Sequence, residues 1–471
     1  MARLNMQSRR KLREKHISRR DFELYTQAAV LEPLQAQALF RSLYQGITEG
    51  TVEDALILLC MLTGQDIEDF IDIETLKRAG KLLDDIDKNT VYLKRVIGVP
   101  DANKKADPQH LEKSSKEFLM PLPVDVVNLV RSRSSENPLR KQRVISKISD
   151  RLTEHKNNSG IALLSTGRCK STLHTLIRRK FGDQVIADFI CNKSVKHSPA
   201  LNYICYPLDD VLKTYKKAIE FLSEGTSFSL EYLNLAIEEA AGKKCGSQNV
   251  VKLDSAKEYF GTLLNTVNTE KNRALKHNAI TLWLWNVISL LTTSRAVQHI
   301  PGYSEQIDLG SKYIWIADKE NRNVSAGRFI PICYFLEKTF QAYFQYLKTL
   351  KNEWALKDLE LANILDGIEK NAHPLLFFKT QEKWEAATVA HTLQLIEGLP
   401  SFPSNWTRQF TRTFLAGRHS DCIINAIFSH EKLDQEVLNT YSSVPLFELR
   451  AVTNSYDELV RTLNLSLPDK W

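Results

Sequence analysis

Several features that would point to particular protein classes are missing from this chain of 471 residues. Its longest apolar run, Ile280 to Leu291, is too short to cross a bilayer and predicts a buried helix. The first twenty residues are basic and contain no apolar stretch, so we expect no signal peptide. The seven cysteines form no CxxC pair, which argues against zinc and disulfides and suits reduced thiols in a cytosol. There is no GxxxxGKS or GxxxxGKT loop, so we expect no use of ATP.

The composition is that of a globular protein, with 43% hydrophobic and 25% charged residues. The length predicts two or three domains. The net charge is +7, and basic residues crowd the N-terminus. A basic block of this kind is either a solvated tail or an arm that condenses on a polyanion and releases counterions. We expect a DNA-binding arm that includes Arg9, Arg10, Lys11, Arg13, Arg19 and Arg20.

The hydrophobic pattern is mainly helical. Apolar residues recur at three- and four-residue spacing in 209–222, 256–275, 332–350 and 383–396, which predicts helices. The clearest strands are two short alternating runs, Tyr313 to Ala317 and Phe329 to Ile332, on either side of a polar connection. We therefore expect a mainly α fold with a small antiparallel hairpin or sheet in the C-terminal half, α+β overall.

Two polar segments that are poor in helix signals suggest domain boundaries, at 100–115 and 241–251. We place the main division near residue 241. On this interpretation, residues 1–240 hold the basic arm and a helical DNA-binding region, and residues 241–471 form a catalytic domain.

One segment of the N-terminal half is similar in residue pattern to a segment of the C-terminal half. The segment 55–70 has the shape of 280–299, but it carries Gln65 and Asp66 where the later segment has Ser294 and Arg295. An ancient duplication whose first copy lost its catalytic residues would explain this similarity. A helical DNA-binding module without any duplication is the simpler alternative, because apolar helices resemble one another by chance.

Five residues with phosphate chemistry follow one another in the C-terminal half. They are Arg295 in LLTTSRAVQH, Lys319 in IADKENR, Arg408 in NWTRQF, His430 in FSH and Tyr441 in NTYSS. Over about residues 255–450, this order resembles the active-site boxes of tyrosine recombinases, the phage-integrase family. The resemblance implies that double-stranded DNA is cut and rejoined through a 3′-phosphotyrosyl intermediate.

Elementary chemistry gives each of these residue types a role. A phenol has a pKa near 10, so Tyr441 needs help to act as a nucleophile at neutral pH. Arg295 and Arg408 can each bind two phosphate oxygens and stabilise the transition state, by roughly 3–4 kcal/mol for each well-aimed donor. His430 can add a hydrogen bond. Lys319 can protonate the leaving 5′ oxygen if neighbouring cations lower its pKa. This scheme requires neither a metal nor a cofactor.

Some of these assignments have neighbours that compete with them. Lys312 is an alternative to Lys319, Arg412 lies one helical turn after Arg408, and Tyr456 is the other tyrosine downstream. The chain also departs from the family pattern at Asn405, which stands where His or Lys is usual. Asparagine can donate a hydrogen bond to phosphate but cannot carry a proton near neutral pH. Gln298 and Gln409 are further departures.

We therefore expect a site-specific recombinase or integrase of a mobile element. The resemblance implies a homo-tetramer on two DNA sites, and we expect a cytoplasmic, nucleoid-associated protein in a prokaryotic or mobile-element context without a membrane partner. Two alternatives stay open. One is a telomere resolvase or type IB topoisomerase, and the other is a DNA-binding relative that has lost its activity.

Overall fold

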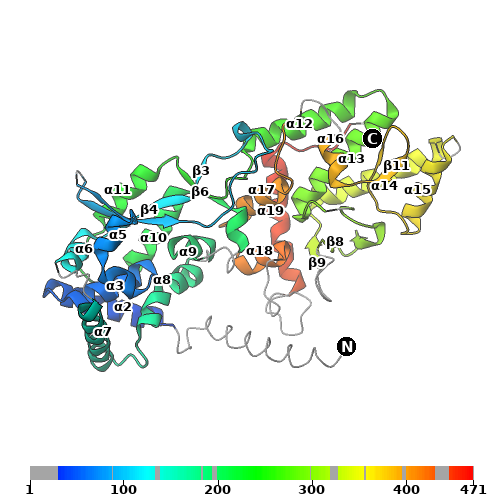
Figure 1. The fold of residues 1–471 in the computed structure, drawn as a ribbon. Coiled ribbons are helices and arrows are strands. Elements are labelled where there is room, and N and C mark those ends of the chain that lie inside the picture. The colour runs from blue at the N-terminus through cyan, green and yellow to red at the C-terminus, as the bar shows by residue number, and fades with distance from the viewer. Residues whose placement is uncertain are drawn as a thin grey trace. The chain divides into compact units, whose positions relative to one another are not determined.

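A computed structural model describes residues 30–86, 88–132, 138–181, 184–193, 199–297, 299–318, 327–354, 357–394, 399–429, 445–469 and 471. The protein is mainly helical and has small antiparallel sheets (Figure 1). The chain folds into two compact units. The first comprises Met1–Val99, Ser114–Leu201 and Tyr206–Gly246, and the second comprises Pro100–Lys113, Asn202–Cys205 and Ser247–Trp471. Within the described ranges, no helix is long and apolar enough to cross a membrane.

The first unit is a set of helices around one antiparallel sheet. Strands β1, β2 and β4 pair in that order, and short strands β3 and β6 pair in parallel. The strands are β1 (Leu82–Asp85), β2 (Thr90–Val96), β3 (Ser114–Ser115), β4 (Glu117–Leu122) and β6 (Lys244–Gly246), and β5 (Cys205–Pro207) begins in the second unit. The helices are α2 (Pro33–Thr48), α3 (Val52–Thr63), α4 (Ile67–Ile71), α5 (Ile73–Arg78), α6 (Val124–Arg131), α7 (Pro138–Ser159), α8 (Thr166–Lys180), α9 (Gln184–Ile190), α10 (Leu208–Leu222) and α11 (Glu231–Ala240). The short helix η3 (Pro199–Tyr203) begins in the first unit and ends in the second.

A buried charge network holds α7 against α2 and α3. The Arg151 guanidinium donates to both carboxylate oxygens of Asp54, and the closest distance, from Nη2 to Oδ2, is 2.7 Å. His155 Nε2 lies 2.7 Å from Asp54 Oδ1, and its Nδ1 lies 2.8 Å from Ser42 Oγ. Gly46 leaves the room for this carboxylate, because a Cβ there would lie 1.7 Å from Asp54 Oδ2. The network therefore depends on a glycine inside α2.

The second unit places helices around another small antiparallel sheet, whose strands pair in the order β7, β8, β9 (Figure 1). Its strands are β7 (Ile307–Asp308), β8 (Tyr313–Ile316), β9 (Arg328–Pro331), β10 (Phe377–Lys379) and β11 (Trp384–Ala386). Its helices are η2 (Pro108–His110), α12 (Leu253–Thr269), α13 (Arg273–Thr292), η4 (Ser304–Gln306), α14 (Tyr334–Trp354), α15 (Leu359–Glu369), α16 (Val389–Gln394), α17 (Trp406–Leu415), α18 (Asp421–Phe428), η5 (Leu446–Ala451) and α19 (Val452–Thr462).

Helix α13 is the centre of the second unit. It contains the apolar run Ile280 to Leu291, and every residue from His277 to Thr292 is buried, as predicted. The helix ends at Thr293, whose φ of 52° is unusual for a β-branched residue. Thr293 Oγ1 donates to Ile427 O at 3.1 Å, which fixes this end of α13 near the end of α18.

The expected hairpin is confirmed in its strands. β8 and β9 pair antiparallel, with Tyr313 opposite Pro331 and Ile316 opposite Arg328. Two predicted helices are wrong in part. The helix expected over 256–275 is broken after Thr269, because Asn272 caps a new helix by accepting from the backbone N–H groups of Ala274 and Leu275.

The helix expected over 383–396 begins instead as a strand. Trp384 lies in β11, where it pairs with Lys379 of β10, and its indole Nε1 donates to Asp358 at 2.8 Å. Burial of this tryptophan beside Phe377, with ring centroids 5.6 Å apart, overrides the helical periodicity. The helical part, α16, begins only at Val389.

The two units differ from the predicted ranges in three short segments. Residues 100–113 and 202–205 belong to the second unit, and residues 241–246 belong to the first. The functions expected of residues 1–240 and 241–471 stay predictions. The basic arm, with Arg9 to Arg20, lies outside the described residues.

Candidate active site

The candidate site is built where α13 ends and the chain turns toward Arg295. Asp318, at the end of the β8 strand region, reaches this turn: its Oδ2 accepts from the backbone N–H of Arg295 at 2.9 Å. Arg328 of β9 pairs with the same carboxylate through Nη1–Oδ1 at 2.7 Å and Nη2–Oδ2 at 3.0 Å. Burial opposes ionisation of Asp318, but Arg328 outweighs it and lowers its pKa to about 2. The hairpin and the Arg295 turn are thus tied by one charged carboxylate.

Arg408, on helix α17, is a further arginine that contacts the end of α13. Its side chain is fully buried, with Nη1 donating to Thr293 O and Nη2 to Phe428 O. The Thr293 carbonyl also accepts from Arg328 Nη2 at 3.1 Å, so two arginines meet at one oxygen. Burial, together with the charge of Arg328, lowers the pKa of Arg408 to about 9. Arg408 therefore stays charged at neutral pH and joins the end of α13 to the end of α18.

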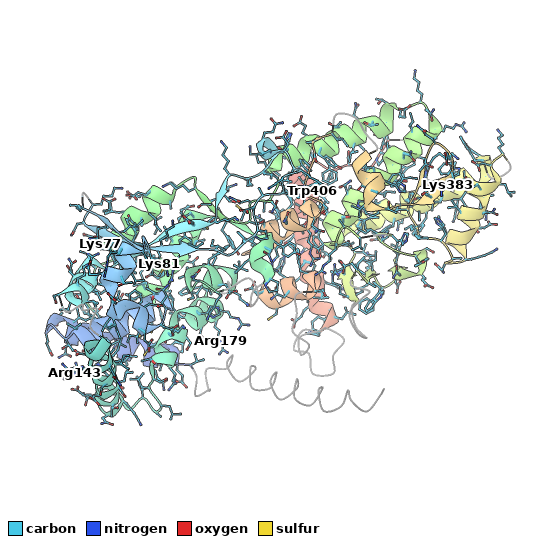
Figure 2. The ribbon with its side chains drawn as sticks, viewed as in Figure 1. Lys77, Lys81, Arg143, Arg179, Lys383 and Trp406 are labelled. Atoms are coloured by element: carbon cyan, nitrogen blue, oxygen red, sulfur yellow. The ribbon has the colours of Figure 1, made fainter. Side chains whose placement is uncertain are left out.

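Aromatic packing sets where α17 begins. Trp406, labelled in Figure 2, is buried with its ring centroid 5.0 Å from that of Phe402 and 5.5 Å from that of Tyr259. Because Trp406 lies two residues before Arg408, this packing fixes the helix turn that carries the arginine. The position of Arg408 is thus a consequence of the apolar core.

Asn405 precedes α17 and has a structural contact of its own. Its Oδ1 accepts from the backbone N–H of Ala296 at 3.0 Å. This bond holds the residue after Arg295 against the start of α17. A phosphate contact by Asn405 would therefore fall to its Nδ2, and that role stays a prediction.

Arg295 is the arginine of this cluster with the least engaged side chain. It is half-buried, and its buried Nε has no hydrogen-bond partner among the described residues. The charges that act most strongly on Arg408 are Arg328, Asp318 and Arg295. These four side chains carry an excess of two positive charges. A partly buried cluster of this kind favours an anion, because uncompensated charge is costly away from water.

Three of the predicted catalytic residues, Lys319, His430 and Tyr441, lie outside the described residues, as does Gln298. Two of the three have a cluster residue close by in the sequence. Asp318 directly precedes Lys319, and Phe428, whose carbonyl accepts from Arg408, comes two residues before His430. The roles of these three residues stay predictions.

The competing residues lie in other surroundings. Arg412 is buried and contacts α18, with Nη2 3.2 Å from Asn425 Oδ1 and 3.7 Å from Asp421 Oδ1. Tyr456 is fully buried in α19, and burial raises its pKa, which opposes its use as a nucleophile. Gln409 is buried on α17.

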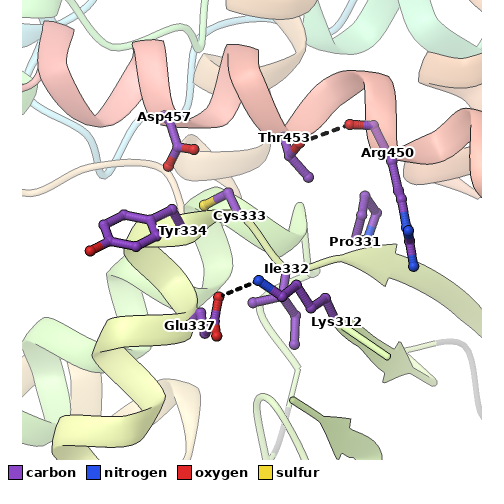
Figure 3. Close-up of a pocket in the computed structure, with 9 residues that line it drawn as sticks. All are labelled: Lys312, Pro331, Ile332, Cys333, Tyr334, Glu337, Arg450, Thr453 and Asp457. Carbon is purple, nitrogen blue, oxygen red and sulfur yellow. Dashed lines mark hydrogen bonds and ion pairs between the residues drawn. The ribbon is translucent and has the colours of Figure 1, made fainter. Parts of the chain in front are cut away.

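Lys312 lines a separate cavity of about 220 Å³ between β9, the start of α14 and α19 (Figure 3). Its Nζ pairs with Glu337 at 2.9 Å. Arg450 lines another side of the cavity, with its Nε 3.2 Å from Tyr313 Oη. Lys312 thus lines a cavity to which none of the clustered arginines contributes.

Two residues of the cluster were absent from the sequence prediction. Asp318 is a carboxylate whose contacts are to the Arg328 side chain and the Arg295 backbone N–H. Tyr203, whose ring centroid lies 5.2 Å from Arg408 Cζ, comes from a segment 205 residues earlier. Two sequence signals could have found them. Asp318 directly precedes Lys319, and the amino-acid sequence after Tyr203 is similar to that after Tyr441.

Comparison with known proteins gives no relative: no family model, no curated protein and no solved structure matches this chain. The resemblance to tyrosine recombinases rests on the residues of the chain itself.

Proposed function

We propose that this protein cuts and rejoins double-stranded DNA through a phosphotyrosine, as a site-specific recombinase of a mobile element. The observation that carries the proposal is the arginine cluster. Arg328 pairs with the carboxylate of Asp318, the Arg295 backbone N–H donates to it, and Arg408 acts on it through its charge. The Arg295 Nε has no hydrogen-bond partner among the described residues. A phosphodiester is an anion with two oxygens that can accept from guanidinium groups. Bound there, it would offset the excess positive charge.

The connections of the cluster support a catalytic use of that phosphate. The carboxylate that fixes Arg295 directly precedes Lys319, the expected general acid. The carbonyl that accepts from Arg408 comes two residues before His430, the expected donor to the same phosphate. The cluster therefore contains the residue directly before Lys319 and a carbonyl two residues before His430.

The reaction is balanced without a further reactant. The Tyr441 oxygen attacks phosphorus and gives up its phenol proton to solvent, the bond from phosphorus to the 5′ oxygen breaks, and the leaving oxygen takes a proton from Lys319. The phosphotyrosyl ester keeps the energy of the diester. The released 5′ hydroxyl of a partner strand can therefore reverse the step and join the strands.

A gel assay tests the proposal. Full-length protein is incubated with a pool of nicked duplexes of randomised sequence, whose short cleaved strand diffuses away and prevents rejoining. We expect a covalent protein–DNA product on denaturing gels from the wild type. Tyr441→Phe is expected to lose most of that product. A Tyr441→Phe protein that matches the wild type would refute the assignment of the nucleophile.

A second candidate function is DNA binding without cleavage. The burial of Arg408, with Nη1 and Nη2 both donating to backbone carbonyls, favours it, because a structural arginine would look the same. DNA retained on native gels without any covalent product would support this candidate. If the product does form, a two-site recombination assay beside a supercoil-relaxation assay separates a recombinase from a topoisomerase or a telomere resolvase.

The remaining parts of the proposal come from the resemblance. We propose a homo-tetramer on two DNA sites, with the basic arm on the duplex, in the nucleoid of a prokaryotic cell. Sedimentation of the protein with and without DNA measures this assembly.

A further inference from the structure

A second tyrosine lies at the arginine cluster. Tyr203 belongs to the short segment Asn202–Cys205, which is part of the second unit. Its ring centroid is 5.2 Å from Arg408 Cζ and 6.5 Å from the ring of Phe428. The guanidinium thus has an aromatic ring near it on each of two sides, since the Phe428 centroid is 4.8 Å away. Tyr203 is only half-buried, so its side chain also reaches solvent.

Specific hydrogen bonds hold this segment against α17. Thr413 Oγ1 donates to Tyr203 O at 3.2 Å and lies 3.4 Å from the backbone N–H of Cys205. The backbone N–H of Ser247 donates to Ile204 O at 2.8 Å. Because Thr413 lies on the same helix as Arg408, the position of Tyr203 is fixed relative to that arginine.

The sequence around Tyr203 is similar to that around Tyr441. Each tyrosine is followed by three residues and then by Pro-Leu, as YICYPL and YSSVPL. A Leu-Asn pair lies directly before Tyr203, and another lies before Tyr441 with Thr440 between them. Pro207 directly precedes α10, and Pro445 directly precedes η5. Tyr203 is thus the counterpart, in the N-terminal half, of the predicted nucleophile.

The order of elements in the two units agrees with this correspondence. Each has a pair of helices, α2–α3 or α12–α13, followed by a three-stranded antiparallel sheet whose strands pair in chain order. The second helix of each pair is followed by a left-handed residue, Gly64 with a φ of 66° or Thr293 with a φ of 52°. A duplication accounts for both likenesses, and it explains why a tyrosine of this type occurs twice.

We propose that Tyr203 is a second active-site tyrosine, able to attack the phosphodiester at the arginine cluster in addition to Tyr441. This inference rests on the proposed function. In the step, a bond forms between Tyr203 Oη and phosphorus, the bond from phosphorus to the 5′ oxygen breaks, and the phenol proton passes to solvent. The 5′ oxygen leaves as a hydroxyl after taking a proton from the general acid. Arg408 beside the ring stabilises the negative charge that develops at the phosphate.

The test compares four full-length proteins on the nicked duplex pool: wild type, Tyr203→Phe, Tyr441→Phe and the double variant. Covalent products are digested with protease and nuclease, and mass spectrometry locates the nucleotide-bearing tyrosine. We expect Tyr441→Phe to keep a weaker product whose modified peptide contains Tyr203. The double variant is expected to lose all product, and Tyr203→Phe to keep the product at Tyr441.

The matched control is Tyr206→Phe, three residues further along and assigned to the first unit, which should leave every product unchanged. Phenylalanine keeps the ring beside Arg408, so loss of product reports loss of the hydroxyl. If the wild type forms product and Tyr441→Phe forms none, or forms it on a tyrosine other than Tyr203, this inference is wrong and the proposed function stands. If the wild type forms no product, both are wrong.

Discussion

The carboxylate of Asp318 pairs with the buried Arg328 and also accepts from the backbone N–H of Arg295, a residue of the candidate site. Substitution Asp318→Asn keeps the shape of the side chain but removes its charge, leaving the Arg328 guanidinium buried without a counter-ion. The Asp318 pKa of about 2, against an ordinary value of 3.8, corresponds to about 2 kcal/mol of stabilisation at neutral pH. Breaking a buried ion pair typically costs about 3–5 kcal/mol. We therefore expect a loss of about 2–5 kcal/mol in the free energy of unfolding.

Tryptophan fluorescence during urea unfolding measures this loss selectively. All seven tryptophans of the chain lie after Ser247, in the second unit, so their emission reports the unfolding of that unit. The matched control is Asp366→Asn. Asp366 pairs with Lys351 at the same distance of 2.7 Å, but its side chain is 49% exposed, and exposed pairs contribute little.

The dependence on pH gives a second measurement. The pKa of Asp318 is lower in the folded state, so its contribution is complete above the unfolded pKa and is lost as pH falls from about 3.8 toward 2. The difference between wild type and Asp318→Asn should therefore shrink on acidification. Equal urea midpoints for the two proteins at neutral pH would refute the reasoning.

Three further predictions concern other side chains. Arg295→Gln should lower strand cleavage about 100- to 1,000-fold, as removal of a transition-state donor does, with little change in urea midpoint. Arg408→Gln should lower both, because the Phe428 carbonyl loses its Arg408 donor and the Thr293 carbonyl keeps only the bond from Arg328. Gly46→Ala should destabilise the first unit, measured by circular dichroism, because its Cβ would lie 1.7 Å from a carboxylate oxygen; Gly261→Ala, with open space around it, should gain up to about 1 kcal/mol. Burial lowers the pKa of His277 to about 4, so stability should fall as pH drops from about 6.5 toward 4, by about 3 kcal/mol, and His277→Gln should flatten that profile.

Periodicity and propensity predicted the parts of the fold that local patterns decide. The hairpin between Tyr313 and Ile332 and the burial of α13 are both carried by short runs of sequence, and both are confirmed. The helix expected over 383–396 was wrong in its first part, because Trp384 lies in a strand and packs against Phe377, and it was right from Val389 on. Local pattern cannot report such a contact.

The residues of the candidate site also divide into those that the sequence predicted and those that it did not. The sequence led to Arg295 and Arg408 because their residue types and spacing fit phosphate chemistry, and their backbone surroundings converge at Thr293. It did not lead to Asp318 or Tyr203. Asp318 acts through a hydrogen bond from the backbone N–H of Arg295, 23 residues away. Tyr203 lies 205 residues before Arg408, the arginine that its ring contacts. Both contacts exist only in the folded chain.

The central claim, cleavage through a tyrosine ester, is tested most directly by identifying the bond itself. Wild-type protein is reacted with the nicked duplex pool, the covalent product is digested, and the modified peptide is sequenced by mass spectrometry. We predict a nucleotide attached through its 3′ phosphate to Tyr441 as the main product, with a free 5′ hydroxyl on the released strand. DNA bound by the protein without any phosphotyrosyl peptide, or a nucleotide attached through its 5′ phosphate, would contradict the claim.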